Sequence, residues 1–386
     1  MIIKYFIVMK IKNPKEDNIF IWSPMISHVG TIRAAIGMGN SFIKHGNKKV
    51  FLLNIFGEFN NYKDKNNFIL LNVFNNFPFY KTGIISKILI YFFTLLAIPS
   101  LFYFTIKYKP KLIITCLVGY IPCILKNFFS NIIIINSIQG YPKINFFRKF
   151  IWEKTYSKSD HIITMTNITK SSLCADFQLD KSKVTKIDNP IIFSDIKLMA
   201  NEKIDNEDLE IFKKKVFCSI GRLTRQKNYF ELLKGFKLYS TQVNDNVNLI
   251  IIGDGEEKNA LNKFIKKEKI KNCYLLGFKK NPYKYLAKSS LFISTSSWEE
   301  PGHTMIEAGY LNIPVLTSDC PNGPREIIKD SINGFKYKLN DLNSLVAKIA
   351  YVDLMSKKDL YKVKTNMKKI TSNFTEFKFY KKIISL

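Results

Sequence analysis

A short basic loop carries the first residues that could do chemistry. In Ser219–Asn228, Gly221 follows the apolar run 215–220 and is followed in turn by Arg222 and Lys227. An arginine fork and a lysine ammonium on one loop can neutralise a diphosphate without a metal ion. The alternative is a basic turn with solvated side chains. The use of arginine in a lysine-rich chain favours the diphosphate site.

Two glutamates form a second candidate constellation further along the chain. Glu299 and Glu307 flank the sequence Gly302-His303-Thr304. If a helix begins near His303, the backbone N–H groups at its start attract a phosphate. Glu307 would then lie one turn into the helix, where a carboxylate can accept ribose hydroxyls, and Glu299 could meet a sugar. The alternative is a capping carboxylate and a solvated helix face.

Several common catalytic and cofactor motifs are absent from the sequence. It contains no G-x-x-x-x-G-K-[ST] phosphate loop, and neither Gly37/Gly39 nor Gly253/Gly255 completes G-x-G-x-x-G. There is no G-x-S-x-G elbow. There is also no D-x-D pair, the usual means of holding a sugar nucleotide through a metal. Neither a nicotinamide cofactor nor a metal is therefore expected.

The elements that must position these residues alternate between short apolar strands and helices. This alternation is typical of parallel sheets. Strands are predicted at 19–22, 49–54, 68–73, 111–115, 131–136, 161–165, 215–220, 247–252, 273–276, 291–294 and 313–317. Helices are predicted at 31–45, 146–157, 229–241, 256–268, 303–311 and 341–350.

The two series of strands predict two doubly wound α/β domains facing a cleft. A polar, acidic stretch within 189–209 separates the series, so we expect domains at 1–195 and 205–374. Ligands of such sheets bind outside the carboxyl ends of the strands. The loops after 215–220 and 291–294 lie at such ends, and both carry the residues singled out above.

The composition is basic, but its cause is ambiguous. The chain of 386 residues has 59 Lys+Arg against 31 Asp+Glu, a formal charge of +28, with only five arginines. Lysine, asparagine and isoleucine share A/T-rich codons, so genome composition is the simplest explanation. A basic face toward anionic lipid is the second. Nucleic acid is not expected, because no zinc-finger spacing, aromatic RNA motif or basic arm occurs.

The cysteines and the apolar segments indicate in which cellular compartment the chain folds and whether it crosses a membrane. The six cysteines are isolated, which indicates reduced, buried thiols. Residues 1–17 are interpreted as an extension outside the ordered fold. The run 88–106 has no charge over 19 residues, long enough for a membrane span, but Pro99 interrupts it. A buried or membrane-apposed helix is therefore favoured over a span.

The ordered motifs resemble family 4 of the glycosyltransferases, which has the GT-B fold. They are G-R-L-x-x-Q-K-N, I-I-G-D-G-E-E, L-L-G-F, E-x7-E and I-P-V-L-T-S-D-C-P-N-G-P-R-E-I, all between Ser219 and Gly334. A looser likeness covers the first half. There Gly30-Thr31-Ile32-Arg33 resembles the family's glycine loop.

The resemblance implies metal-independent, anomer-retaining transfer from a nucleotide sugar. It assigns catalysis to Glu299, Arg222 and Lys227. It places the donor among Gly30, Gly221, Arg222, Lys227, Gly253, Glu299, Gly302, His303, Thr304 and Glu307. The first domain would bind the acceptor, the second the donor, and a final helix at 375–386 would return to the first domain.

The chain departs from the family pattern after the strand at 131–136. Many members have a histidine there, whereas this chain has Gln139, which can hydrogen-bond a sugar but cannot carry a proton at neutral pH. We expect Arg33 and Gln139 to contact the acceptor. Arg148 lies nearby, where it would either contact an anionic acceptor or belong to a solvated basic loop.

These observations predict transfer of a hexose or N-acetylhexosamine, with UDP the expected nucleotide. The expected acceptor is a saccharide, lipid-linked or part of an envelope polysaccharide. A cytoplasmic location follows, extended to the inner face of the membrane if the basic charge meets anionic lipid. The alternatives are an epimerase or phosphorylase of the same fold, or a non-catalytic sugar-nucleotide-binding scaffold.

Overall fold

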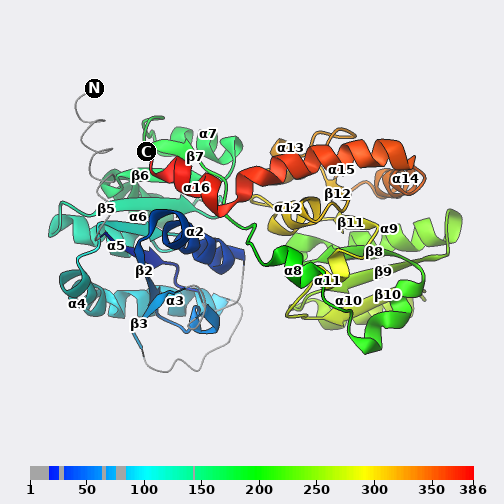
Figure 1. The fold of residues 1–386 in the computed structure, drawn as a ribbon, viewed down its shortest axis with the longest axis horizontal. Helices are drawn as coiled ribbons and strands as arrows, with labels where there is room; N and C mark the ends of the chain where they lie inside the picture. The colour runs from blue at the N-terminus through cyan, green and yellow to red at the C-terminus, as the bar shows by residue number, and fades with distance from the viewer. Residues whose placement is uncertain (1–16, 26–29, 63–66, 75–83, 142–143) are drawn as a thin grey trace. The chain divides into compact units, whose positions relative to one another are not determined.

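The structure is a computed structural model that describes residues 17–25, 30–62, 67–74, 84–141 and 144–386. The chain forms two compact α/β units (Figure 1). One contains the residues up to Ile191 together with Phe374–Leu386, and the other is Ile192–Asn373. Of the expected extension 1–17, only Asp17 lies among the described residues, where it pairs with Lys48 at 3.0 Å.

The first unit is built on a parallel sheet of seven strands in the order β3-β2-β1-β4-β5-β6-β7. Its central strands are continuous apolar runs because helices cover both faces of a parallel sheet. The strands are β1 (Asn18–Trp22), β2 (Lys49–Asn54), β3 (Ile69–Asn72), β4 (Leu112–Thr115), β5 (Ile133–Ile138), β6 (His161–Thr164) and β7 (Val184–Lys186).

The helices of the first unit include the C-terminal one. They are α2 (Gly30–Gly46), α3 (Ile84–Leu96), α4 (Ile98–Tyr108), α5 (Tyr120–Ile124), α6 (Phe146–Lys158), α7 (Asn167–Asp176) and α16 (Glu376–Ile383). α16 packs on α2, where Phe42 meets Tyr380 edge to face and Lys44 pairs with Glu376 at 2.8 Å.

The second unit is built on a parallel sheet of six strands in the order β10-β9-β8-β11-β12-β13. The strands are β8 (Lys215–Ile220), β9 (Val247–Ile252), β10 (Cys273–Gly277), β11 (Leu291–Ser294), β12 (Val315–Ser318) and β13 (Phe335–Tyr337). The α-helices are α8 (Ile196–Ala200), α9 (Tyr229–Gln242), α10 (Lys258–Lys267), α11 (Tyr283–Leu286), α12 (His303–Tyr310), α13 (Gly323–Ile327), α14 (Leu342–Asp353) and α15 (Lys357–Thr371).

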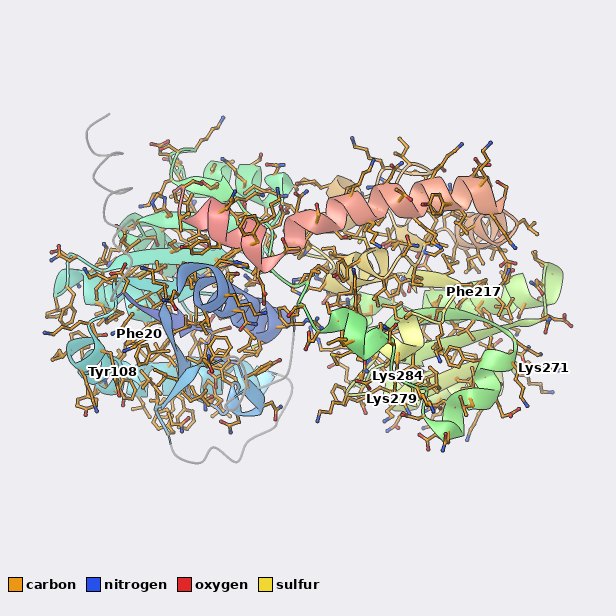
Figure 2. All side chains as sticks on the ribbon, viewed as in Figure 1. Phe20, Tyr108, Phe217, Lys271, Lys279 and Lys284 are labelled. Carbon is orange, nitrogen blue, oxygen red and sulfur yellow. The ribbon has the colours of Figure 1, made fainter. Side chains whose placement is uncertain are left out.

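Each unit has its own apolar core. Phe20 is buried in the first and Phe217 in the second, whereas Lys271 lies exposed at the end of β10 opposite the candidate site (Figure 2). The cysteines are free thiols, and all but Cys273 are fully buried, as the sequence predicts. The predicted fold class, two doubly wound parallel-sheet domains, is confirmed.

The apolar run 88–106 is broken at Ala97. α3 and α4 are bent by 47° there, and Pro99 lies in the first turn of α4, where a missing N–H is tolerated. Leu101 packs into the core while Phe92 is exposed. Among the described residues no single helix is long and apolar enough to cross a membrane. Only the bent pair, taken together, meets the length and composition required.

Candidate active site

The residues that the sequence singles out in the second unit gather at one edge of its sheet. The strand order reverses between β8 and β11, and open parallel sheets bind ligands outside the carboxyl ends at such a point. The loop after β8 carries Arg222 and Lys227, and the loop after β11 carries Glu299. Because the strands are parallel, both loops leave the same edge.

The glycines of the first loop are required by close backbone contact. Gly221 donates its N–H to the carbonyl of Ile252 at 3.0 Å, and Leu223 donates to Asp254 at 2.9 Å. Gly253 has a φ of +152°, and a Cβ on it would lie 1.9 Å from the Gly221 carbonyl oxygen. The G-D-G turn after β9 therefore packs against the backbone of the basic loop and fixes its position.

Lys227 and Glu299 form an ion pair across the two loops. A 3₁₀ turn, η4 (Arg225–Lys227), brings the Lys227 ammonium onto Glu299 Oε1, and Ser296 Oγ donates to the same oxygen at 2.6 Å. The side chains are only 17% and 10% exposed. Their attraction is therefore stronger than that of an exposed pair in water.

The backbone of Glu299 is fixed by the Pro/Gly loop that follows β12. Glu299 donates its N–H to the carbonyl of Pro321 at 2.8 Å, and Asn322 and Gly323 donate to the Glu299 carbonyl at 2.9 and 3.0 Å. A Cβ on Gly323 would lie 2.0 Å from the carbonyl oxygen of Pro301. The Pro/Gly loop after β12 thus fixes the Glu299 backbone at a position from which the carboxylate reaches Lys227.

Arg222 differs from Lys227 in its surroundings. Its side chain is exposed and, within the part of the chain that the structure describes, makes no hydrogen bond or ion pair. It lies on the same loop as Lys227. The loop therefore presents the exposed guanidinium of Arg222 together with the ammonium of Lys227, which a carboxylate already engages.

The helix α12 begins beside Glu299. Gly302 is its N-cap with a φ of +93° and no side-chain cap, and a Cβ on it would lie 3.6 Å from Glu299 Cβ. His303 and Thr304 follow in the first turn, whose N–H groups have no intrahelical acceptor. Glu307 lies one turn further and is buried. The predicted helix start, and the position of both glutamates relative to it, are confirmed.

The titratable groups beneath the site are held neutral. Burial raises the pKa of the Cys320 thiol to about 11, and the negative charge of Glu299 adds to that shift. Burial also raises the pKa of Tyr229 well above its ordinary value, although a hydrogen bond with Ser219 opposes it. Neither group is prepared to act as a base at neutral pH.

Two of the sequence-predicted residues of the first unit, Arg33 and Gln139, contact one segment after β7. Gln139 follows β5 and accepts a hydrogen bond on Oε1 from Asn189 at 2.9 Å. Arg33, in the first turns of α2, donates to the carbonyl of Ile191 at 3.3 Å. Gly30 is the exposed first residue of α2. Arg33 and Gln139 are thus both tied to 189–191, a constraint that the sequence did not indicate.

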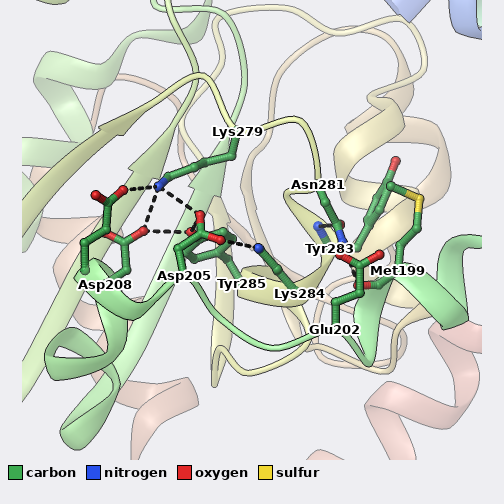
Figure 3. A network of polar contacts seen from close by, with 10 residues as sticks. Met199, Glu202, Asp205, Asp208, Lys279, Asn281, Tyr283, Lys284 and Tyr285 are labelled. Atoms are coloured by element: carbon green, nitrogen blue, oxygen red, sulfur yellow. Dashed lines mark hydrogen bonds and ion pairs between the residues drawn. The ribbon is translucent and has the colours of Figure 1, made fainter.

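A cluster of carboxylates elsewhere in the second unit is occupied by lysine. Side-chain oxygens of Asp205, Glu207 and Asp208 lie within 4.8 Å of one another, but Lys279 Nζ contacts them at 3.2, 3.1 and 2.8 Å (Figure 3). Lys284 contacts Asp205 at 2.5 Å and holds the pKa of that carboxyl well below its usual range. The cluster joins η3 (Asn206–Lys213) to the loop after β10 and serves as a structural clamp.

Comparison with known proteins agrees with this geometry. Residues 201–369 match the family model described as "Glycosyl transferases group 1". An uncharacterised glycosyltransferase of Methanocaldococcus jannaschii is 37% identical over 245 residues. An N-acetylgalactosaminyltransferase of Campylobacter jejuni, named for a diphospho-undecaprenol acceptor, is 30% identical over 209 residues. These alignments cover 59% and 53% of this chain and only 60% and 54% of the relatives.

Solved structures extend the likeness to the whole fold. The Anabaena protein HepE, in complex with UDP and glucose, aligns with a TM-score of 0.75 at 17% identity, covering 95% of this chain and 98% of its own. A glycosyltransferase from Rickettsia africae gives a TM-score of 0.76 at 18% identity, with 96% and 97% covered. At such identity the likeness establishes the fold, which is GT-B, and nothing about substrates.

Proposed function

We propose that the chain is a retaining glycosyltransferase that uses a UDP-sugar and needs no metal ion. The observation that carries this proposal is the Lys227–Glu299 pair at the point where the strand order of the second unit reverses. It combines a positive group for a diphosphate with a carboxylate for a sugar. The match of residues 201–369 to the group 1 glycosyl transferases supports the same conclusion.

The proposed division of labour follows the charges of the reaction. Glycosyl transfer develops positive charge on the sugar ring and negative charge on the leaving diphosphate. Arg222 and Lys227 neutralise the diphosphate, and Glu299 stabilises the ring. Fixed charges aimed at developing charge are the largest single contribution that a protein makes to such a step. Glu307 holds the ribose, and the N–H groups of 302–304 bind phosphate.

Lys227 must change partners for this chemistry. It is engaged by Glu299 in the structure, so an incoming diphosphate competes with that carboxylate. Once the ammonium moves to the phosphate, Glu299 retains Ser296 and its backbone contacts, which keep it in place beside the sugar. Gly30 is proposed to approach the diphosphate from the first unit, and Arg33 and Gln139 the acceptor.

The proposed acceptor is a lipid-linked or envelope saccharide. The Campylobacter jejuni relative and an Escherichia coli galactosyltransferase, 26% identical, are both named for acceptors carrying a diphosphoundecaprenol group. The donated sugar is a hexose or N-acetylhexosamine. An anionic membrane surface, meeting the exposed apolar side of α3 and α4, is proposed as the place where such an acceptor is found.

Calorimetry with UDP, GDP and ADP, with EDTA present throughout, tests the donor half of the proposal. We expect UDP to bind tightest, and Arg222→Ala and Lys227→Ala each to weaken it about tenfold or more. Lys271→Ala is the matched control, because Lys271 is exposed at the opposite end of the sheet. Equal binding of all three nucleotides, or binding that requires a divalent ion, would contradict the proposal.

A further inference from the structure

The second half of the basic loop is tied to the loop that follows β11. Thr295, the first residue after β11, donates its hydroxyl to the carbonyl oxygens of Lys227 and Asn228, both at 3.0 Å. Thr295 is only 1% exposed, so its hydroxyl is satisfied by these two carbonyls and not by water. One side chain of the β11 loop therefore holds the main chain of the lysine to which the proposed function gives a diphosphate.

Gln226 adds two ties on the other side of Lys227. Its carbonyl accepts the N–H of Ser297 at 2.8 Å, and its side-chain amide donates to the carbonyl of Trp298 at 2.8 Å. The residues before and after Lys227 are thus both joined to the segment that leads into Glu299. These bonds use neither the ammonium nor the carboxylate, so opening the ion pair does not break them.

The turn after Lys227 also has a defined shape. Asn228 has a φ of +50°, in the left-handed region that asparagine tolerates better than most residues. Its side-chain amide donates to the carboxylate of Glu231, in the first turn of α9, and Glu231 donates its N–H to the Asn228 carbonyl at 3.1 Å. These contacts fix the direction in which the chain leaves Lys227 for α9.

The two ends of the basic loop are held by different neighbours. The Arg222 end is fixed by the turn after β9, through the N–H groups of Gly221 and Leu223. The Lys227 end is fixed by the loop after β11, through Thr295. A change at Thr295 should therefore act on Lys227 and leave Arg222 in place.

A fixed main chain matters at this position because lysine is a point charge on a flexible stem. Ordering a mobile main chain when the ligand binds would subtract from the affinity, whereas a main chain that is already held adds no such cost. The ammonium of Lys227 can then change partners by rotation of its side chain alone.

We infer that Thr295 is a positioning residue for the lysine that binds the diphosphate. It holds the Lys227 main chain in place while the ammonium passes from Glu299 to a phosphate oxygen. This inference rests on the proposed function, because only that function gives Lys227 a diphosphate to bind. It assigns to Thr295 an effect on affinity for the diphosphate and none on affinity for the nucleoside.

Calorimetry with UDP, and displacement of UDP by uridine, both in EDTA, test the inference. Thr295→Val keeps the shape of the side chain without its hydroxyl and should weaken UDP binding about five- to tenfold. Uridine, which has no phosphate, should bind as it does to wild type. Thr295→Ser keeps the hydroxyl and should restore UDP binding. Thr105→Val is the matched control, because Thr105 of α4 is 2% exposed and donates to the Leu101 carbonyl at 2.7 Å.

A double-substitution cycle gives the sharpest readout. In protein that already carries Lys227→Ala, Thr295→Val should weaken UDP by no more than about twofold, because the group that it positions is gone. In protein that carries Arg222→Ala, the same change should again weaken UDP about five- to tenfold, because Arg222 is held by the other anchor. A general loosening of the site would instead weaken UDP by the same factor in both backgrounds.

The outcomes separate this inference from the proposed function. Equal weakening of UDP in both backgrounds, weakening of uridine as large as that of UDP, or native UDP binding by Thr295→Val would overturn the positioning role while the proposed function still holds. If Thr295→Val does not fold, Gln226→Ala, at a less buried position, takes its place in the same cycle and is judged in the same way. Failure of UDP to bind to wild type would count against the proposed function.

Discussion

At the scale of single residues, Lys227 and Glu299 form an ion pair, and the proposed function requires a diphosphate to draw the ammonium away. Ser296 donates to the Glu299 carboxylate, and Pro321, Asn322 and Gly323 hold the Glu299 backbone. Among the described residues, by contrast, the Lys227 ammonium contacts only that carboxylate. The lysine is therefore the partner that moves. This asymmetry predicts different consequences for the two substitutions.

Glu299→Gln should separate binding from turnover. Removing the carboxylate frees Lys227 for phosphate, so we expect UDP to bind at least as tightly as in wild type. Turnover should fall by about 10²–10³-fold, because the charge that stabilises the ring is lost. Lys227→Ala should lower both. Calorimetry and steady-state rates measure the two effects, and weaker UDP binding in Glu299→Gln would contradict the partner exchange.

Glu58 gives a separate prediction about stability and pH. Burial raises its pKa to about 8 from an ordinary value of 4.5, although the N–H groups of Ile55 and Phe56 donate to it. Between these two values the folded protein keeps a proton that the unfolded chain has released. The free energy of unfolding should therefore fall as the pH rises from about 4.5 to about 8.

Glu58→Gln resembles the protonated acid. It should therefore remove the contribution of Glu58 to the decrease in the free energy of unfolding between about pH 4.5 and about pH 8. Urea unfolding of both proteins at intervals from pH 5 to pH 8.5 measures it. An unchanged slope in the variant would show that the carboxyl does not keep its proton in the folded state.

At the scale of elements, the sequence predicted the strands best where they are long and buried. The bounds of β2, β8, β9 and β11 match the predicted ranges, since parallel strands covered on both faces are continuous apolar runs. β7 and β13 were missed because each has only three residues at a sheet edge. Pro99 indicated an interruption of 88–106, but the division into two helices at Ala97 was not predicted, because the hydropathy of the run continues across it.

Gly253→Ala tests whether the turn after β9 holds the basic loop that carries Arg222 and Lys227 in place. The added Cβ would meet the Gly221 carbonyl, so the basic loop must move. We expect the free energy of unfolding to fall by about 1–3 kcal/mol and UDP to bind much more weakly. Gly140→Ala is the matched control, since nothing lies within 4 Å of its added Cβ. Thermal unfolding and calorimetry measure both, and native UDP binding in Gly253→Ala would refute the support role.

At the scale of the whole molecule, charge and apolar surface predict attraction to anionic membranes. The formal charge is +28, and Phe92 and Ile106 of α3 and α4 are 54% and 61% exposed. We expect binding to vesicles that contain anionic lipid, weakened by salt. Phe92→Ser with Ile106→Ser should reduce it, whereas Phe278→Ser, which changes a side chain 71% exposed in the second unit, should not. Co-sedimentation measures this, and no binding at low salt would contradict it.

The sequence also predicted more of the second unit's site than of the first unit's. The positions of Arg222, Lys227 and Glu299 at one sheet edge follow from strand alternation, but the contact between Lys227 and Glu299 does not, because 72 residues separate them. The anchoring of Glu299 by 321–323 depends on contact between the loops after β11 and β12, which no local pattern indicates.

The most direct test is acceptor-dependent release of UDP, in EDTA, from a panel of UDP-hexoses and UDP-N-acetylhexosamines. The acceptor is an isoprenyl-diphosphate-linked saccharide, and the anomeric configuration of the product is read by NMR. We predict UDP release only with acceptor, a product with the anomeric configuration of the donor, and a loss of about 10²-fold or more in Glu299→Gln. An inverted product, an epimerised sugar nucleotide formed without acceptor, or full activity in Glu299→Gln would contradict retaining transfer at this site.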